Sequence, residues 1–196
     1  MMAGNAALPM EQKFFSMQEL KDIGFSLYKI GKMVSCGKLV KLNKGCYENT
    51  AYSGEESDFY YVAAYVPQGV ICLMSAAVYY GLTTYIPSEI DVAIPRKAKV
   101  STLPNWPHLA IHYYTDNRHT LGVETIREGR NKFKIYDIEK TVVDIVFYKE
   151  SVGIEETKEI LTAYLQRPER NLNKLLRYAQ PMKCAKVLRG YLEVLI

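Results

Sequence analysis

Two helix-start signals ten residues apart constrain the fold of this 196-residue chain more than any other feature. Ser16 precedes Met17-Gln18-Glu19 at capping-box spacing, in which the serine and the glutamate each bond the other's backbone N–H. Ser26 is a second N-cap, and Gly24 and Gly37 stand where the two helices should end, because glycine adopts the left-handed conformation at little cost. The segment therefore predicts two short helices joined by a tight turn, which is the helix-turn-helix arrangement.

The second helix, expected over residues 27–36, has two different faces. At about 100° per residue, Leu27, Ile30 and Val34 fall within one narrow arc, with Met33 at its flank. We expect this face to pack, and the other to offer two cations, a phenol and a hydroxyl to a partner. The residues on that opposite side are Tyr28, Lys29, Lys32, Ser35 and Cys36.

A basic β-hairpin is expected directly after this helix. The predicted strands are Leu39-Val40-Lys41-Leu42 and Cys46-Tyr47-Glu48, and the connection is Asn43-Lys44-Gly45. Glycine at the third position of the connection suits the positive φ of a three-residue hairpin loop. A helix-turn-helix followed by a hairpin is a winged helix, which would carry Lys41 and Lys44 on its wing near a phosphate backbone.

The lysines of this segment have no acidic neighbours in the sequence. Five lysines and no carboxylate lie between Asp22 and Glu48. Lysine contacts to phosphate give DNA affinity and salt dependence, whereas base edges are read by side chains on the exposed helix face. The alternative is a small helical domain whose lysines only keep it soluble. The candidate DNA-binding residues are Ser26, Tyr28, Lys29, Lys32, Ser35, Lys38, Lys41 and Lys44.

The rest of the chain predicts a second domain of mixed structure. A hydrophobic content of 48% supports a real core. The expected helices cover residues 57–66, 70–80, 137–149, 154–165, 168–179 and 182–195, and the expected strands cover 89–94, 109–114, 123–128 and 132–136. This order predicts an α+β or α/β fold with domains over residues 1–50 and 51–196, the second having helices that flank a small mixed or antiparallel sheet.

A second group of cations gathers near the C-terminus. Arg170, Lys174 and Arg177 lie within about 60° of one another on the helix expected to start at Pro168, since proline suits a first turn. A solvated helix face accounts for this pattern, and a second surface for nucleic acid or an acidic partner is the alternative. The candidate residues of such a surface are Arg167, Arg170, Lys174, Arg177, Lys183 and Lys186.

No pattern in the sequence predicts an active site. Glu89 and Asp91 alternate along an expected strand and would share a face, as the metal-binding carboxylates of a nuclease do, but Ala93 stands where such a site has a lysine. His108 and His112 also share a strand face, with no third ligand nearby. The glycines form neither a Walker loop nor a G-x-G-x-x-G run. We therefore expect no enzyme, no metal and no cofactor.

Cysteine spacing and hydropathy favour a cytoplasmic protein. The four cysteines form no C-x-x-C pair, which is typical of reduced thiols. The longest weakly polar run, residues 70–82, is shorter than the roughly 20 residues that span a bilayer. The first residues also lack the pattern of a secretory signal.

Three segments of the chain resemble the AbiEi antitoxins of bacterial type IV toxin–antitoxin and abortive-infection phage-defence systems. In order, they are FSMQELKDIGFSLYKIGKMVSCGKLVKLNKGCYEN, MSAAVYYGLTTYIPSEIDVAIPR and YDIEKTVVDIVFY. The resemblance runs along nearly the whole chain, although Lys140 stands where arginine is frequent in the family.

This resemblance implies a winged-helix domain that binds inverted repeats in the promoter and represses the protein's own operon. It also implies a C-terminal domain that neutralises a nucleotidyltransferase-like toxin without requiring a stable complex, and monomers that load cooperatively onto the two repeats. The toxin's own motif, a Gly-Ser pair followed by paired aspartates, is absent from the sequence. The alternatives are a metal-dependent nuclease that uses Glu89 and Asp91, and a transcription factor whose second domain senses a ligand.

Overall fold

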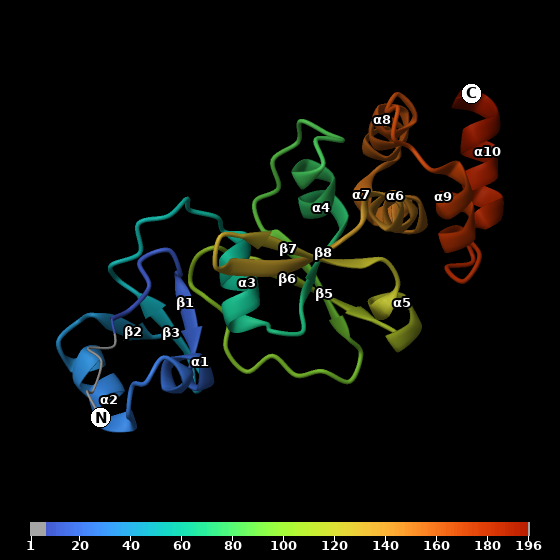
Figure 1. Ribbon diagram of the computed structural model, residues 1–196. Coiled ribbons are helices and arrows are strands. Elements are labelled where there is room, and N and C mark those ends of the chain that lie inside the picture. The colour runs from blue at the N-terminus through green and yellow to red at the C-terminus, as the bar shows by residue number, and fades with distance from the viewer. Residues whose placement is uncertain (1–6, 196) are drawn as a thin grey trace. The chain divides into compact units, whose positions relative to one another are not determined.

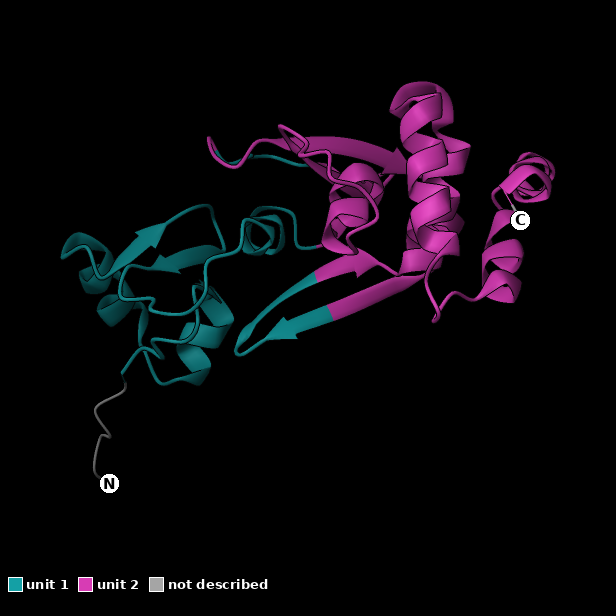
Figure 2. Cartoon of the chain, turned by 90° about the horizontal axis from the view of Figure 1, so that it is seen from above, with its two compact units in different colours: residues 1–67, 100–104, 126–133 teal, residues 68–99, 105–125, 134–196 magenta. Residues whose placement is uncertain are grey.

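A computed structural model describes residues 7–195, which fold into two compact units (Figures 1 and 2). Unit 1 takes the described residues up to Pro67 together with residues 100–104 and 126–133, and unit 2 takes residues 68–99, 105–125 and those from 134 onward. The described residues form ten helices and two sheets, the mixed class that was expected. None of these helices is long and apolar enough to cross a membrane.

Unit 1 contains two short helices, a three-stranded antiparallel sheet and a third helix. Its elements are β1 (Phe14–Ser16), α1 (Met17–Asp22), α2 (Leu27–Ser35), β2 (Leu39–Lys41), β3 (Cys46–Asn49) and α3 (Phe59–Tyr65). The strand order is β1-β3-β2, with Phe15 opposite Tyr47 and Val40 opposite Glu48. The buried core joins sheet and helices through Phe15, Leu20, Phe25, Ile30, Leu39 and Tyr47. The unit thus continues past residue 50, where the sequence placed the domain boundary, and includes α3.

The predicted helix starts and stops are confirmed. The Ser16 hydroxyl accepts a hydrogen bond from the Glu19 N–H at 3.1 Å, and the Glu19 carboxylate accepts one from the Ser16 N–H at 2.7 Å. Ser26 caps α2 by accepting from the Lys29 N–H at 3.3 Å. Gly24 has a φ of 102° and Gly37 a φ of 74°, so both are in the region that favours glycine. Local capping chemistry therefore sets the bounds of both helices.

One residue of the expected packed face of α2 is on the surface instead. Leu27 is 61% exposed, whereas Ile30 on the same face is 2% exposed. Phe25 precedes the N-cap and is buried with Ile30 in one core, which are the two positions of a hydrophobic staple. Because the staple fills the core at this end of the helix, Leu27 is left outside it. The prediction that Leu27 packs was wrong.

The hairpin between β2 and β3 turns by a different device from the predicted one. Gly45 does not have a positive φ. The side-chain oxygen of Asn43 instead accepts hydrogen bonds from the N–H groups of Gly45 and Cys46, each at 3.0 Å. An asparagine side chain that bonds its own backbone two residues ahead replaces a backbone turn. The loop conformation therefore depends on Asn43 and not on a left-handed glycine.

Unit 2 is built on a mixed sheet with strand order β6-β5-β4-β8-β7. The strands are β4 (Val70–Ile71), β5 (Ile90–Pro95), β6 (Leu109–Tyr114), β7 (Val123–Glu128) and β8 (Asn131–Tyr136), and Figure 2 shows that the division between the units falls within β7 and β8. The helices are α4 (Leu73–Tyr79), α5 (Asp116–Thr120), α6 (Ile138–Phe147), α7 (Lys149–Val152), α8 (Ile154–Leu165), α9 (Leu172–Ala179) and α10 (Ala185–Leu195). β5 pairs with β6 in parallel and with β4 antiparallel, which makes the sheet mixed.

Several helices of unit 2 differ from the predictions, and α7 is one that was not expected as a separate helix. Residues 70–80 begin as the two-residue strand β4, which is too short for its period to be recognised, and only then form α4. α5 was not predicted. α9 begins at Leu172 and not at Pro168, because Asn171 is its cap and accepts a hydrogen bond from the Lys174 N–H at 2.9 Å. Pro168 therefore lies outside the helix whose first turn it was expected to occupy.

A buried ion pair lies at the centre of unit 2. Lys140 and Asp144 are one turn apart on α6, their side chains are fully buried, and the ammonium group donates to the carboxylate. The ammonium also lies over the Tyr136 ring, 4.2 Å from its centroid, and Tyr114 donates its hydroxyl proton to Asp144 at 3.3 Å. Two strands are thus joined to α6 through one charged cluster.

Removing one partner of this ion pair should lower the free energy of unfolding more than removing both partners does. Lys140→Met leaves Asp144 buried without a cation and should lower the free energy of unfolding by about 3–5 kcal/mol. Lys140→Met combined with Asp144→Leu should recover much of that loss, because no charge then remains buried. Urea unfolding of the wild type, the single variant and the double variant measures this. A double variant as unstable as the single one would contradict it.

Candidate nucleic-acid interface

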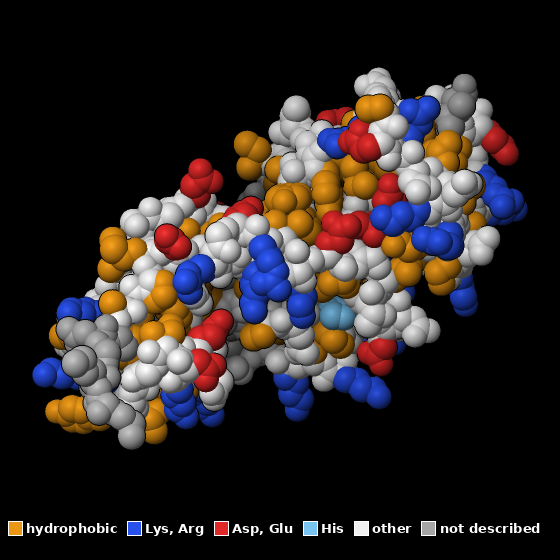
Figure 3. All heavy atoms as spheres, in the orientation of Figure 1, with side chains coloured by type: hydrophobic (Ala, Val, Ile, Leu, Met, Phe, Trp, Pro, Cys, Tyr) orange, Lys and Arg blue, Asp and Glu red, His pale blue; other side chains and the backbone are white. Residues whose placement is uncertain are grey.

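All eight residues predicted to contact DNA are exposed in unit 1. Tyr28, at 80%, is among the most exposed large side chains of the described chain. The eight residues come from the N-cap and body of α2, from the segment that follows it, and from β2 and the hairpin loop: Ser26, Tyr28, Lys29, Lys32, Ser35, Lys38, Lys41 and Lys44. Figure 3 shows Lys and Arg side chains in the region where Figure 1 places α2 and the hairpin. We call these eight residues the α2–hairpin surface.

The lysines of the α2–hairpin surface take part in no ion pair among the described residues. The acidic groups of unit 1 that are closest to them in sequence are used elsewhere. Asp22 accepts from the Gln18 amide at 2.8 Å, and Glu48 accepts from the Tyr61 hydroxyl at 3.4 Å. These cations are therefore available to an external anion.

Two of the predicted base-contacting residues already have internal partners. The Ser26 hydroxyl oxygen is the helix cap, and the Ser35 hydroxyl donates to the Lys32 carbonyl at 2.9 Å. The side chains of Tyr28, Lys29 and Lys32 have no such local bond in the described residues. Direct contacts from α2 would therefore come mainly from these three.

The hairpin is held against the end of α2 by a side-chain bond. Thr50, just after β3, donates its hydroxyl proton to the Gly37 carbonyl at 2.9 Å. The backbone N–H of Lys38 also bonds the Met33 carbonyl at 2.9 Å, which closes the helix end. Lys38 and Lys41 therefore keep a set position relative to α2. The surface of this region also has an apolar part that the sequence did not predict, because Leu27 and Val40 are 61% and 44% exposed.

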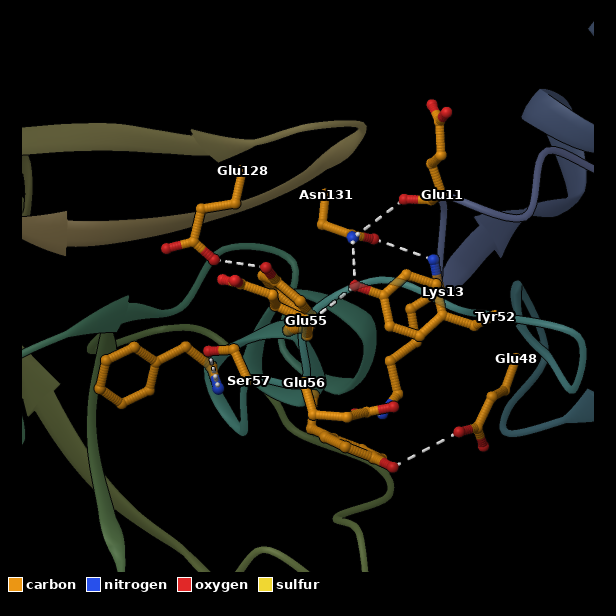
Figure 4. Close-up of polar contacts among 12 residues, drawn as sticks. Glu11, Lys13, Glu48, Tyr52, Glu55, Glu56, Ser57, Glu128 and Asn131 are labelled. Atoms are coloured by element: carbon orange, nitrogen blue, oxygen red, sulfur yellow. Dashed lines mark hydrogen bonds and ion pairs between the residues drawn. The ribbon is translucent and has the colours of Figure 1, made fainter.

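A buried cation in unit 1 contrasts with these exposed ones. Lys13 is only 4% exposed, donates to Glu56, and lies over the Tyr61 ring at 4.7 Å (Figure 4). The side-chain oxygen of Asn131 accepts a hydrogen bond from the backbone N–H of Lys13 at 2.9 Å. The side-chain NH₂ group of Asn131 donates to the Tyr52 hydroxyl at 3.1 Å. Segments far apart in sequence are thus joined behind β1.

Electrostatics fix the charge of Lys13. Burial alone would lower the pKa of its ammonium group, but the hydrogen bonds and charges of Glu56 and Tyr61 outweigh burial and raise that pKa above its ordinary value. Lys13 is therefore a cation at neutral pH whose charge is paired with Glu56 and lies over the Tyr61 ring. Unlike the lysines of α2, it adds nothing to an external surface.

The predicted second basic surface is divided by the structure. Lys174 points to two buried carboxylates, Asp137 at 3.2 Å and Glu139 at 2.8 Å. Arg167 donates to the Tyr80 carbonyl and to Glu169. The exposed remainder, which lies on and around α9 and α10, is Arg170, Arg177, Lys183 and Lys186.

The carboxylates considered for a nuclease are not arranged as a metal site. Asp91 accepts from the Ser75 N–H at 3.3 Å and pairs with His112 at 2.8 Å, so both of its oxygens are engaged. Glu89 is exposed and precedes β5, and His108 precedes β6. The described residues contain no group of three or more histidine, cysteine or acidic side chains that could hold a metal ion.

Comparison with known proteins identifies no relative: no protein-family model and no curated protein sequence matches this chain. A function can therefore be argued only from the residues, their geometry and the sequence resemblance described above.

Lys174 should contribute to stability and its neighbour Arg177 should not. Lys174→Met leaves Asp137 and Glu139, each about 5% exposed, without their cation, so the free energy of unfolding should fall by about 2 kcal/mol. Arg177→Met removes an exposed guanidinium from the same helix and should change it by less than about 0.5 kcal/mol. Urea unfolding compares the two.

The contribution of Lys174 to stability should depend on pH in a defined direction. Burial would lower the pKa of Lys174, but the Glu139 and Asp137 carboxylates raise it above the ordinary value of 10.5. The stability that Lys174 contributes is therefore fully present below pH 10.5 and is lost as the pH rises above that value. From neutral pH upward, the difference between wild type and Lys174→Met should stay constant until that alkaline range and shrink within it. Equal losses in the Lys174 and Arg177 variants at neutral pH would contradict the assignment.

Proposed function

We propose that unit 1 is a winged helix-turn-helix domain that binds double-stranded promoter DNA through the α2–hairpin surface. The observation that carries this proposal is a set of five exposed lysines on one helix and the hairpin after it, none of which forms an ion pair within residues 7–195. Unpaired lysines that have no internal role are suited to phosphate, where they release counterions on binding. The capped helices and the Thr50 bond give these charges a fixed spacing.

The surface offers two kinds of DNA contact. Tyr28, Lys29 and Lys32 project from α2, which in a helix-turn-helix is the helix placed in the major groove. Lys38, Lys41 and Lys44 would contact phosphates on either side of that groove, so they contribute affinity without sequence choice. Sequence preference would then rest on the first group.

We further propose that the protein is a transcriptional autorepressor and the antitoxin of a type IV toxin–antitoxin phage-defence system. The sequence resemblance to AbiEi antitoxins supports this, and so does the presence of a second compact unit beside the proposed DNA-binding one. Unit 2 would neutralise a nucleotidyltransferase-like toxin in the cytoplasm without a stable complex. The protein would act as a monomer that loads cooperatively on inverted repeats, with no enzymatic activity of its own.

The nuclease alternative receives less support from the geometry. Asp91 has both carboxylate oxygens engaged by Ser75 and His112, and the exposed Glu89 is outside β5. A metal-dependent nuclease needs carboxylates free to bind the ion. If the purified protein nicked DNA with Mg²⁺ and Glu89→Ala with Asp91→Ala abolished the nicking, the non-enzymatic proposal would fail.

Replacing two helix lysines should weaken promoter binding in a salt-dependent way. Lys29→Ala with Lys32→Ala should reduce affinity for the upstream intergenic DNA. The slope of log affinity against log salt should become shallower by about 0.9 for each lysine that contacts a phosphate. Mobility shifts at several salt concentrations measure both quantities. The matched control is Lys149→Ala with Lys158→Ala, two lysines of unit 2 that pair with Glu150 and Glu155, and its slope should equal that of the wild type.

Repression and toxin neutralisation should be separable. The Lys29→Ala, Lys32→Ala variant should lose repression of a reporter driven by its own promoter, because DNA affinity falls. In a growth assay with a nucleotidyltransferase toxin of the kind proposed as its partner, the same variant should still rescue cells, because unit 2 is unchanged. A variant that keeps full repression would refute the DNA-binding surface. Loss of rescue at normal protein levels would refute the division of roles between the units.

A further inference from the structure

Unit 2 has a pocket that the DNA-binding proposal does not use. Its volume is about 370 Å³, which is within the range of small-molecule sites. It is lined by the first residues of α4, by β5 and β6, by the residues around α7 and by the first turn of α8. All of these elements belong to the same compact unit, so the pocket is formed within one folded body.

The side chains that line the pocket have a definite chemical character. They include the carboxylates of Asp91 and Glu156, the rings of Tyr85 and Tyr148, and the imidazole of His112. No lysine or arginine is among the described residues that line it. The pocket therefore presents negative charge and aromatic surface together.

Asp91 holds the imidazole of His112 in a fixed orientation. One carboxylate oxygen pairs with Nε2 of His112 at 2.8 Å, and the other accepts from the Ser75 N–H at 3.3 Å. The Ser75 hydroxyl in turn accepts from the Asp91 N–H at 2.8 Å. The Asp91 side chain is only 16% exposed, and α4 and β5 anchor it from both sides. This wall of the pocket is thus preorganised.

Glu156 is positioned by a glycine. Gly153 has a φ of 114°, and a Cβ added there would lie 2.0 Å from the nearer Glu156 carboxylate oxygen. The absence of a side chain at position 153 therefore lets this carboxylate lie over the start of α8. An alanine at this position would both strain the backbone and displace the carboxylate.

The backbone at the pocket is itself in an unusual conformation. Leu73, which lines the pocket at the start of α4, has a φ of 45°. A non-glycine residue is strained in this left-handed region, because its Cβ approaches the following carbonyl oxygen. Such conformations persist where the surroundings enforce them, and they concentrate at ligand sites.

A bare metal ion does not fit these groups. Asp91, His112 and Glu156 supply ligand types that metals use, yet no three such side chains in the described residues converge on one point. The carboxylates are instead set at separate places around a volume much larger than an ion. A ligand that fills this volume would be a molecule and not a single ion.

We propose that this pocket binds a small organic cation, an alkylammonium or guanidinium compound. Its charge would lie beside the Glu156 carboxylate, with Asp91 adding negative charge to the same pocket while it stays bonded to His112 and Ser75, and its carbon body would lie against Tyr85 and Tyr148. Aromatic faces attract such cations as well as cover their apolar part. The Tyr148 ring stacks on Tyr114 with centroids 6.0 Å apart and an interplanar angle of 24°, and the Arg118 guanidinium lies 5.2 Å from its centroid, so the bound cation would need the part of the ring that faces the pocket. This site does not depend on whether unit 1 binds DNA.

Titration calorimetry of the full chain tests the proposal with agmatine, putrescine and benzylamine as probes. At least one of these cations should bind, and benzyl alcohol, which has the same ring but no charge, should not. Glu156→Gln should weaken binding by about fivefold, as loss of one partly exposed charge pair would. Glu155→Gln is the matched control, because Glu155 is the exposed neighbour on the same turn and pairs with Lys158.

Tyr85→Ala adds an independent test, since Tyr85 is 54% exposed and its loss should not unfold the protein. This substitution should weaken the binding of benzylamine, the aromatic cation, more than that of agmatine or putrescine. The proposal is overturned if none of the three cations binds at 10 mM, on the order of the weakest affinity usually measured for specific small ligands. It is also overturned if benzyl alcohol binds as well as benzylamine. Equal effects of Glu155→Gln and Glu156→Gln would show diffuse attraction to an acidic surface and would refute the site.

Discussion

The buried ion pair between Lys140 and Asp144 is the constraint on which unit 2 depends. Burial lowers the pKa of Lys140 and raises the pKa of Asp144, while the attraction between the two charges opposes both shifts. Such a pair adds little to stability when compared with an apolar core, but it becomes indispensable once one partner is present. The position of Lys140 on α6 also restricts which residue the neighbouring loop can have at position 122. Gly122 has a φ of 71°, and a Cβ there would lie 2.7 Å from that of Lys140, so only a glycine lets this loop pass over α6.

The same chemistry separates lysines that maintain the fold from lysines that remain for a partner. Lys13, Lys140 and Lys174 are directed to carboxylates or aromatic rings inside the protein. Among the described residues, the lysines of α2 and the hairpin form no ion pair with a carboxylate. A count of charges cannot make this distinction, because both groups have the same residue type. The proposed DNA-binding role rests on the second group only, which is why the internal pairing of Lys174 reduces the case for a second basic surface.

The sequence predicts local features of this fold well and distant ones poorly. Ser16, Ser26, Gly24 and Gly37 act on atoms a few residues away, so the bounds of α1 and α2 follow from the sequence. The partners of Lys174 lie more than 30 residues earlier in the chain, and no helical wheel includes them. Leu27 was misplaced for a related reason. The wheel gives its angle, but burial depends on where the rest of the core lies, and Phe25 already fills that end.

The same contrast between local and distant contacts decides which candidate site the sequence could predict. Exposure of the α2–hairpin surface was predictable, because one amphipathic helix and one hairpin supply all of its residues. The pocket of unit 2 was not, because it draws Asp91, His112 and Glu156 from three elements that only the tertiary fold brings together. The pairing of Asp91 with His112 also changes what the sequence pattern means. Carboxylates that alternate on a strand suggest a metal, but a carboxylate already bonded to Ser75 and an imidazole positions its neighbours. A basic surface in one unit and an acidic pocket in the other then favour two ligands of opposite charge, each matched to its own folded body.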